Sequence, residues 1–252
     1  MPLSLKEKIL SECRGSGVTA KEIVHKLGAS AAEVSATILE LFREGKLRQS
    51  LDEDYDPALP YETLKWKAVE GSRVEELEQP ERQFLMALSI PAWADREFRS
   101  VIEETGTLEL MNAYTQYVRS ARRELIMMSP FVDKFALYPL IESLKANPDL
   151  EAKILTEPET LSQIIPFFSP YLGRVKAKAL GARLRIEGKT KPLGLHMKSV
   201  IVDRKVAMVG SFNLTERHLH INLDCAIVID GGPLVEQLVK IFERLWTIAD
   251  QI

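Results

Sequence analysis

Apolar residues recur at helical spacing in three short stretches at the start of the chain. The three stripes are Leu5, Ile9 and Cys13, then Ile23, Val24 and Leu27, then Val34, Ile38 and Leu41. Each stripe begins at a hydroxyl residue followed three positions later by glutamate, at Ser4 and Glu7, Thr19 and Glu22, and Ser30 and Glu33. This spacing is that of a capping box, which satisfies the free amides at a helix N-terminus. Three short helices are therefore predicted, and Gly28 and Gly45 fall where two of them should end.

Two strand-like runs, 46–51 and 63–69, follow the third helix and are joined by an acidic loop that contains prolines. This order of three helices and a hairpin resembles a small winged helix-turn-helix domain over residues 1–70, with 71–80 as a polar linker. The resemblance implies DNA binding through the third helix, which would lie in the major groove. That helix carries a single basic residue, Arg43, and the loop is acidic. A role in protein contact or dimer formation therefore stands as an equal alternative.

From residue 81 to residue 252, strand patterns alternate with helix patterns. Strands are expected at 124–129, 151–156, 195–203, 206–211 and 225–230, and helices at 108–123, 135–145 and 233–252. Such alternation predicts an α/β domain, with a mixed sheet flanked by helices.

One stretch within these strands concentrates residues that carry chemistry. His196 and Lys198 stand two apart in a predicted strand, so both side chains are expected to project from one face of the sheet. Asp203 ends that strand, and the returning strand delivers the sequence Gly-Ser-Phe-Asn at 210–213 beside it. A nucleophilic imidazole, an ammonium group and hydrogen-bond donors would thus meet in one place.

This stretch resembles the motif of the phospholipase D superfamily at every fixed position. The matching residues are His196, Lys198, Asp203, Gly210, Ser211 and Asn213. Further along, Asn222-Leu-Asp224 resembles a downstream element of the family in which glutamate usually stands in place of the aspartate. The resemblance extends from about residue 79 to residue 252 and implies a phospholipase D-like phosphodiesterase domain.

The resemblance also implies a mechanism. His196 would attack a phosphodiester to form a phosphohistidine intermediate. Three residues would hold the non-bridging oxygens of the phosphate: Lys198, Asn213 and Ser211. Asp224 would hydrogen-bond the far ring nitrogen of His196 and fix its tautomer, whereas Asp203 and Gly210 would be structural parts of the motif. The family's chemistry implies no metal ion and no cofactor.

The mechanism needs a second histidine to protonate the leaving oxygen, whereas the chain has one copy of the motif. His25 is followed directly by Lys26, and His218 and His220 have no lysine at the required spacing. The second histidine is therefore expected from another chain, in a twofold homodimer like those of the single-motif members of the family.

Charge is unevenly spread along this chain of 252 residues, whose net charge is −3. Between residues 171 and 205, ten basic residues stand against two acidic ones. This basic segment favours the handling of a polyanion next to the motif, and Lys189 and Lys191 within it are expected to bind substrate. A nuclease acting on nucleic acid is therefore the first hypothesis.

Two other functions stay open. A phospholipid or other small phosphodiester hydrolase would be favoured by a deep apolar pocket over His196. A DNA-binding transcription regulator would combine the N-terminal module with a phospholipase D-like domain. Cys13 and Cys225 lie far apart without metal-ligand spacing, and no apolar run is long enough to span a bilayer. A cytoplasmic protein with no disulfide, zinc site or membrane insertion is expected.

Overall fold

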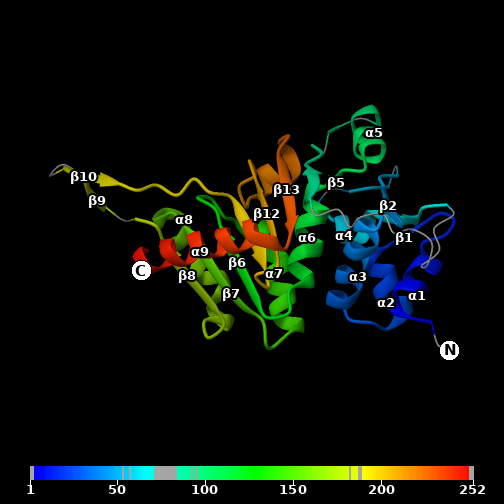
Figure 1. Ribbon diagram of the computed structural model, residues 1–252, viewed down its shortest axis with the longest axis horizontal. Helices are drawn as coiled ribbons and strands as arrows, with labels where there is room; N and C mark the ends of the chain where they lie inside the picture. The colour runs from blue at the N-terminus through cyan, green and yellow to red at the C-terminus, as the bar shows by residue number, and fades with distance from the viewer. Residues whose placement is uncertain are drawn as a thin grey trace. The chain divides into compact units, whose positions relative to one another are not determined.

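The chain forms two compact units, whose elements are labelled in Figure 1. The computed structural model describes residues 3–52, 54–56, 58–70, 84–91, 93–94, 96–181, 183–186 and 189–249, apart from the side chains of 96–98, 183–186 and 189–192. Unit 1 comprises Met1–Ser120 with His220–Cys225, and unit 2 comprises Ala121–Leu219 with Ala226–Ile252. The predicted linker, 71–80, lies outside the described residues. The domain boundaries placed on either side of it stay predictions.

Unit 1 begins with the three expected helices, α1 (Leu5–Glu12), α2 (Ala20–Leu27) and α3 (Ala31–Arg43). All three predicted capping boxes are confirmed. In each, the hydroxyl accepts from the glutamate amide, and the glutamate carboxylate accepts from the amide of the hydroxyl residue. Gly28 ends α2 with a φ of 61°, a left-handed conformation that residues with a Cβ rarely adopt. These local signals therefore set where the helices start and stop.

A three-stranded antiparallel sheet packs on these helices. Its strands are β1 (Val18–Thr19), β3 (Lys65–Ala68) and β2 (Leu47–Ser50), in that spatial order. The two strands of the predicted hairpin are confirmed with narrower bounds, and residues 60–63 instead form a helical turn, α4 (Pro60–Thr63). Trp66 of β3 is fully buried, and its ring meets that of Phe42 edge-on at 5.9 Å between centroids. The hairpin is thereby tied to α3, while the assignment to the winged-helix class stays a prediction.

The rest of unit 1 contains β4 (Phe84–Leu88), α5 (Arg96–Thr105), β5 (Leu108–Glu109) and α6 (Leu110–Ser120). β4 and β5 pair in parallel, and α6 packs against α3. Glu109 is fully buried and accepts from the amides of Met111 and Asn112 at the start of α6, at 3.0 and 2.6 Å. Burial raises the pKa of this carboxyl to about 7, although the two amides act in the opposite direction.

Unit 2 is built on a mixed sheet. Its first elements are β6 (Glu124–Met128), α7 (Lys134–Ala146), β7 (Glu151–Thr156), α8 (Pro158–Ile164), a 3-10 helix (Ile165–Tyr171) and β8 (Val175–Ala179). Then follow β9 (Arg183–Ile186), β10 (Lys189–Pro192), β11 (Ser199–Val202), β12 (Val206–Gly210), a π-helix (Arg217–Ile221), β13 (Cys225–Asp230) and α9 (Gly232–Ile248). Six strands lie in the order β13-β12-β11-β6-β7-β8, antiparallel as far as β6 and parallel from β6 to β8. The predicted α/β fold with a mixed sheet is confirmed.

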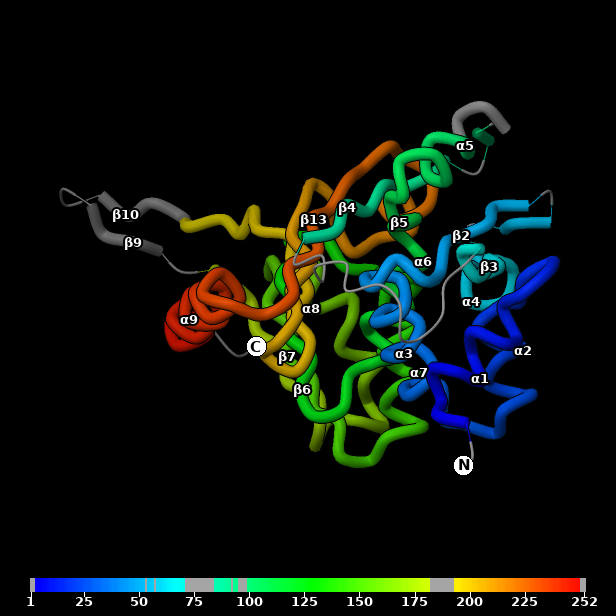
Figure 2. The backbone as a smooth tube through the Cα atoms, turned by 45° about the vertical axis from the view of Figure 1, so that its right-hand side comes forward, coloured from blue at the N-terminus to red at the C-terminus, as the bar shows by residue number. Residues whose placement is uncertain are grey.

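The closing helix, α9, packs across this sheet, as Figure 1 and Figure 2 show in red. Val235, Val239 and Phe242 share one core cluster with residues of β6, β7, β11 and β12. Lys178 of β8 donates to the carbonyl oxygen of Trp246 at 2.9 Å, which fastens the last turn of the helix. Among the described residues, no helix combines the length and the apolar character needed to cross a membrane.

Candidate active site

The hairpin β11–β12 joins the two halves of the predicted motif. Its strands pair antiparallel, with Ser199 opposite Val209. Beyond this pair, the amide of Gly210 donates to the carbonyl oxygen of Lys198 at 3.3 Å. The open end of the hairpin therefore places Lys198 beside Gly210, and the next residue of the returning chain, Ser211, is exposed.

His196 and Lys198 precede β11 and do not lie in it. The prediction of a strand from residue 195 is wrong here, because the strand begins one residue after Lys198. The amide of Leu195 donates to the Glu157 carboxylate. This amide is therefore bonded to a side chain, whereas in a strand it would pair with the backbone of a neighbouring strand. His196 is exposed, whereas Lys198 is 8% exposed and its Nζ donates to the His196 carbonyl oxygen at 3.0 Å. His196 and Lys198 thus differ in burial. Because neither residue lies in β11, the strand geometry that predicted both side chains on one face of the sheet does not hold for them.

Asn213, in the loop after β12, pairs with a histidine that the sequence analysis left out of the site. Its Nδ2 lies 2.9 Å from Nε2 of His218, and Asn213 is 7% exposed. The Oδ1 atom of Asn213 is buried and has no hydrogen-bond partner within the described part of the chain. His218 belongs to the π-helix, an uncommon element that is frequent at functional sites. Only its closeness to Asn213 in sequence could have indicated this contact.

The loop between β6 and α7 holds the segment that follows Asn213. Ser129 Oγ accepts from the amide of Leu214 at 3.2 Å and donates to the carbonyl oxygen of Phe131 at 2.7 Å. Asp133 adds two bonds, since its amide donates to the Leu214 carbonyl oxygen at 2.9 Å and its Oδ2 accepts from the Glu216 amide at 2.9 Å. Two segments that lie 85 residues apart in the sequence are thereby fixed to one another.

Phe131 stands at the same end of the sheet as His196. In the antiparallel β6–β11 ladder, the last residue of β6 lies opposite the first residue of β11. Phe131 comes three residues after that point and His196 three residues before it. The Pro130 carbonyl oxygen accepts from the hydroxyls of Thr156 and Thr160, at 3.1 and 2.8 Å, yet Phe131 is 57% exposed. A firmly held loop therefore presents an aromatic ring to solvent near the motif.

Asp203 lies at the closed end of the hairpin. Its carboxylate accepts hydrogen bonds from three backbone amides of the described residues. Its oxygens accept from the amides of Arg122, Arg123 and Glu124 at 2.9, 2.7 and 2.9 Å. Asp203 and Arg204 have φ angles of 50° and 58°, and two successive positive values are typical of a type I′ turn. This residue ties the hairpin to the start of β6.

Asp224, the residue predicted to orient His196, belongs to unit 1 and is 7% exposed. Its amide donates to Ser89 Oγ, and this hydroxyl lies 2.7 Å from the carbonyl oxygen of Asn222, to which it donates. The backbone around Asp224 is therefore held by Ser89. Its contact with His196 stays a prediction.

The basic residues around the motif have unequal roles. Arg174 donates to two carbonyl oxygens at the end of α7, Lys178 holds the last turn of α9, and Arg204 pairs with two glutamates. These three side chains stabilise the fold, so the charge available to a polyanion is smaller than the sequence count. Lys189 and Lys191 lie on β10, and their side chains are outside the described part of the structure.

In the residues that the structure describes, no group of three or more histidine, cysteine, aspartate or glutamate side chains could hold a metal ion. Cys13 is buried, and burial raises the pKa of its thiol to about 12, whereas Cys225 is exposed.

Residues 114–246 match the family described as "Cardiolipin synthase, PLD-like domain". The match covers more than half of the chain, so the chain belongs to this family of PLD-like domains. Its membership of the phospholipase D superfamily of phosphodiesterases, predicted from the motif, is confirmed.

Two curated relatives share this region. Cardiolipin synthase A from Buchnera aphidicola subsp. Acyrthosiphon pisum (strain APS) is 31% identical over 124 residues, which cover 46% of this chain and 23% of that protein. Cardiolipin synthase A from Buchnera aphidicola subsp. Schizaphis graminum (strain Sg) is 30% identical over 133 residues, which cover 49% and 25%. The chain thus spans about a quarter of the length of these relatives.

Among solved structures, NucT from Helicobacter pylori is similar with a TM-score of 0.52 and 15% identity. The similarity covers 67% of this chain and 99% of NucT. At this identity it shows a shared fold alone.

Proposed function

We propose that this protein is a metal-independent phosphodiesterase that cleaves nucleic acid at an active site built from two copies of the chain. The observation that carries the proposal is the open end of the β11–β12 hairpin. There, His196 is exposed, the nearly buried Lys198 donates through Nζ to the His196 carbonyl oxygen, and the Gly210 amide donates to the Lys198 carbonyl oxygen. A nucleophile that solvent can reach and a cation held in place are what attack on a phosphodiester requires.

In this proposal, a ring nitrogen of His196 attacks phosphorus as the bond to the leaving oxygen breaks. A histidine from the second copy donates the proton that the leaving oxygen needs, and then accepts one from the water that hydrolyses the phosphohistidine. Lys198 and Ser211 stabilise the charge that grows on the non-bridging oxygens. Because Lys198 is largely shielded from water, its charge acts more strongly there than it would in solution.

His218 gives Asn213 a defined role in this scheme. Its Nε2 lies 2.9 Å from Asn213 Nδ2, and it accepts a hydrogen bond from that amide when the imidazole carries its proton on Nδ1. This contact holds the Asn213 side chain in one orientation. We therefore propose His218 as a positioning residue, alongside Asp224 in its predicted role at His196.

Nucleic acid is the proposed substrate because basic residues lead directly into the motif. Four of the eight residues of β9 and β10 are arginine or lysine, and Lys189 and Lys191 are proposed to contact phosphate there. The helices and hairpin of unit 1 are proposed as a winged-helix module that binds DNA or a protein. Its arrangement of α1 to α3 with β2 and β3 supports that assignment.

A phospholipid substrate is the second candidate. It is favoured by the two relatives, both of which carry the name cardiolipin synthase A. The exposed apolar ring of Phe131 near the motif fits either substrate. A lipid acyl chain and a nucleobase would both pack on such a ring.

The test measures turnover of bis(p-nitrophenyl) phosphate, single-stranded DNA, duplex DNA, RNA, and phosphatidylglycerol vesicles in the presence of EDTA. We expect cleavage of at least one nucleic acid, and a loss on the order of a thousandfold or more in His196→Ala. His25→Ala, which removes an exposed histidine of α2, is the matched control and should keep full activity. Unchanged turnover in His196→Ala would refute the assignment of the active site to His196. Cleavage of the phosphatidylglycerol vesicles with no cleavage of nucleic acid would show that the substrate is a phospholipid.

A mixing experiment tests the shared site. If each site needs a histidine from both copies, a hybrid dimer with one His196→Ala chain is inactive. An equal mixture unfolded and refolded together should then keep about a quarter of the wild-type activity, because about a quarter of random dimers are wild type in both chains. Retention of half the activity would show that each chain works alone.

A further inference from the structure

The segment that leads into the motif is held by a side chain from another part of unit 2. The amide of Leu195 donates to the carboxylate of Glu157, which stands between β7 and α8. The same carboxylate lies beside Gly194, where an added Cβ would be 3.8 Å from Oε1. Glu157 therefore contacts the two residues that immediately precede His196, although 38 positions separate it from Leu195 in the sequence.

Glu157 occupies the N-cap position of α8 but does not cap that helix. The structure describes all of α8, and the Glu157 side chain forms no hydrogen bond that caps it. Helices are usually capped by serine, threonine, aspartate or asparagine, whose short side chains accept from the N2 or N3 amide. The longer side chain of Glu157 accepts from Leu195 instead. The stability of α8 therefore does not explain a glutamate at this position, whereas the contact with the next segment does.

The backbone around Glu157 is firmly held, so its carboxylate has a defined position. The Glu157 carbonyl oxygen accepts from the Leu161 amide at 2.9 Å, in the first turn of α8. Just before it, Thr156 is fully buried, and its carbonyl oxygen accepts from the Leu180 amide at 2.9 Å. The Thr156 hydroxyl donates to the Pro130 carbonyl oxygen at 3.1 Å, which ties this junction to the loop after β6. The junction is thus a fixed support for the segment that Glu157 binds.

Contacts on both sides of His196 define the course of its backbone. Before it, Leu195 is 4% exposed and its side chain packs into the core cluster beneath α9. After it, Lys198 Nζ donates to the His196 carbonyl oxygen at 3.0 Å. The imidazole itself is exposed, so its place depends on the backbone from which it projects. A nucleophile must come within about 3–3.5 Å of the reacting atom, and a displacement of about 1 Å can cost about a hundredfold in rate.

We propose that Glu157 is a positioning residue for His196, because by holding the Leu195 amide it sets the place from which the imidazole attacks. This inference rests on the proposed function, since it assigns a role at the same active site. In this scheme Glu157 does not touch the substrate and acts through the residues ahead of the nucleophile. Its loss should therefore slow the chemical step and leave substrate binding nearly unchanged.

The test measures kcat and KM in EDTA, with the phosphodiester that the wild type cleaves fastest. Glu157→Ala should lower kcat on the order of tenfold to a hundredfold, with KM within about twofold of the wild-type value. Glu157→Gln keeps an acceptor oxygen at the same distance from the backbone, so its kcat should be within about threefold of the wild-type value. Recovery in this conservative variant would show that the hydrogen bond to Leu195 is the feature that matters.

Glu157→Asp separates positioning from helix stability. Aspartate is a preferred N-cap residue, so it should cap α8, but it is one methylene shorter than the contact with Leu195 needs. This variant should therefore unfold at a higher urea concentration than Glu157→Ala, while its kcat is as low as that of Glu157→Ala. Hydrogen exchange at the Leu195 amide should be faster in both variants than in the wild type, and slow again in Glu157→Gln.

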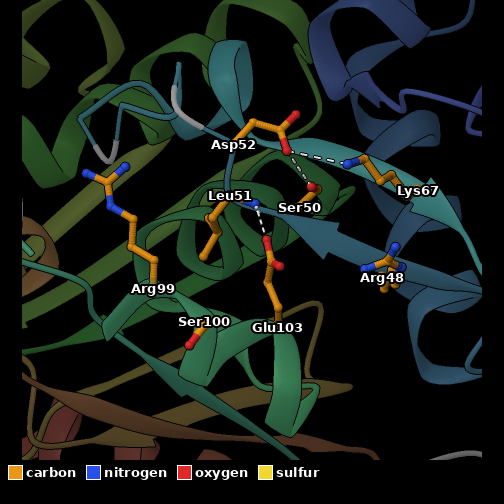
Figure 3. Close-up of a pocket in the computed structure, with 8 residues that line it drawn as sticks. All are labelled: Arg48, Ser50, Leu51, Asp52, Lys67, Arg99, Ser100 and Glu103. Carbon is orange, nitrogen blue, oxygen red and sulfur yellow. Dashed lines mark hydrogen bonds and ion pairs between the residues drawn. The ribbon is translucent and has the colours of Figure 1, made fainter. Parts of the chain in front are cut away.

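Two other glutamates provide matched controls. Glu159→Ala removes an exposed carboxylate two residues further along, in α8. Glu103→Ala removes a bond of the same kind in unit 1, where Glu103 Oε1 accepts from the Leu51 amide at 2.7 Å (Figure 3). Both variants should keep the wild-type kcat, because the proposed effect acts through the Leu195 amide alone.

The possible outcomes separate this inference from the proposed function. No cleavage by the wild type, or cleavage that survives His196→Ala, would refute the proposed function and this inference with it. Cleavage that needs His196 but is as fast in Glu157→Ala as in the wild type would overturn the positioning role alone. An equal loss of kcat in Glu103→Ala, or a kcat that follows the urea midpoint from variant to variant, would show that Glu157 only stabilises the fold.

Discussion

Asp203 offers a quantitative test of how the motif hairpin is anchored. Its carboxylate accepts three backbone hydrogen bonds, each worth about 0.5–1 kcal/mol in a partly exposed setting, so their loss costs about 1.5–3 kcal/mol. Alanine at a φ of 50° adds about 1 kcal/mol of backbone strain. Asp203→Ala should therefore lower the free energy of unfolding by about 2.5–4 kcal/mol in urea denaturation.

Two further substitutions at this position separate the contributions. Asp203→Gly removes the hydrogen bonds but tolerates the left-handed backbone, so it should be less destabilised than alanine by about 1 kcal/mol. Asp203→Asn keeps one acceptor oxygen and should lose the least. Hydrogen exchange at the amides of residues 122–124 should accelerate in the same order. A loss below about 0.5 kcal/mol in the alanine variant, or glycine more destabilising than alanine, would refute this account.

Substitutions at three other positions test separate features. The pKa of Glu109 is raised to about 7 from its ordinary value of 4.5, so between these pH values the folded state keeps a proton that the unfolded state has lost. The free energy of unfolding of the wild type should therefore fall by about 3 kcal/mol from pH 4.5 to 7 relative to that of Glu109→Gln. Parallel curves of unfolding free energy against pH for the two proteins would contradict this. Phe131→Ala should lower kcat/KM for single-stranded DNA about tenfold and Phe131→Trp should retain it, while an equal effect on a phosphodiester without aromatic rings would exclude stacking. His218→Ala should reduce kcat on the order of tenfold, with a smaller loss in His218→Gln, and full activity in both would remove its positioning role at Asn213.

The sequence predicted best what is encoded locally. Ser4, Thr19 and Ser30 each start a helix because the capping partner is three residues away, so no tertiary contact is needed to recognise it. In unit 2, periodicity also predicted β6, α7, β7, β11, β12, β13 and α9 in their order, but it missed α8 and β8. The two-residue strand β1 and the hairpin β9–β10 were not predicted, since such short strands leave almost no pattern in the sequence.

The site was harder to predict where a residue depends on distant partners. The apolar run around His196 suggested a longer strand, but Glu157 takes the Leu195 amide and the ladder starts later. Charge counting treated Lys178 as available to substrate, whereas helix carbonyl oxygens occupy it. Glu109 resembled any surface glutamate until burial showed otherwise. Each of these outcomes depends on residues brought together only by the fold.

The loop that bears Phe131 is fastened at the carbonyl oxygens of Pro130 and Phe131 and through the Ser129 hydroxyl, and none of these hydrogen bonds involves the Phe131 ring. Its exposed ring is therefore free to vary without loosening the segment that carries Asn213. Relatives with different substrates could diverge at this position while conserving the phosphate chemistry, so selectivity and reactivity can evolve separately in this fold.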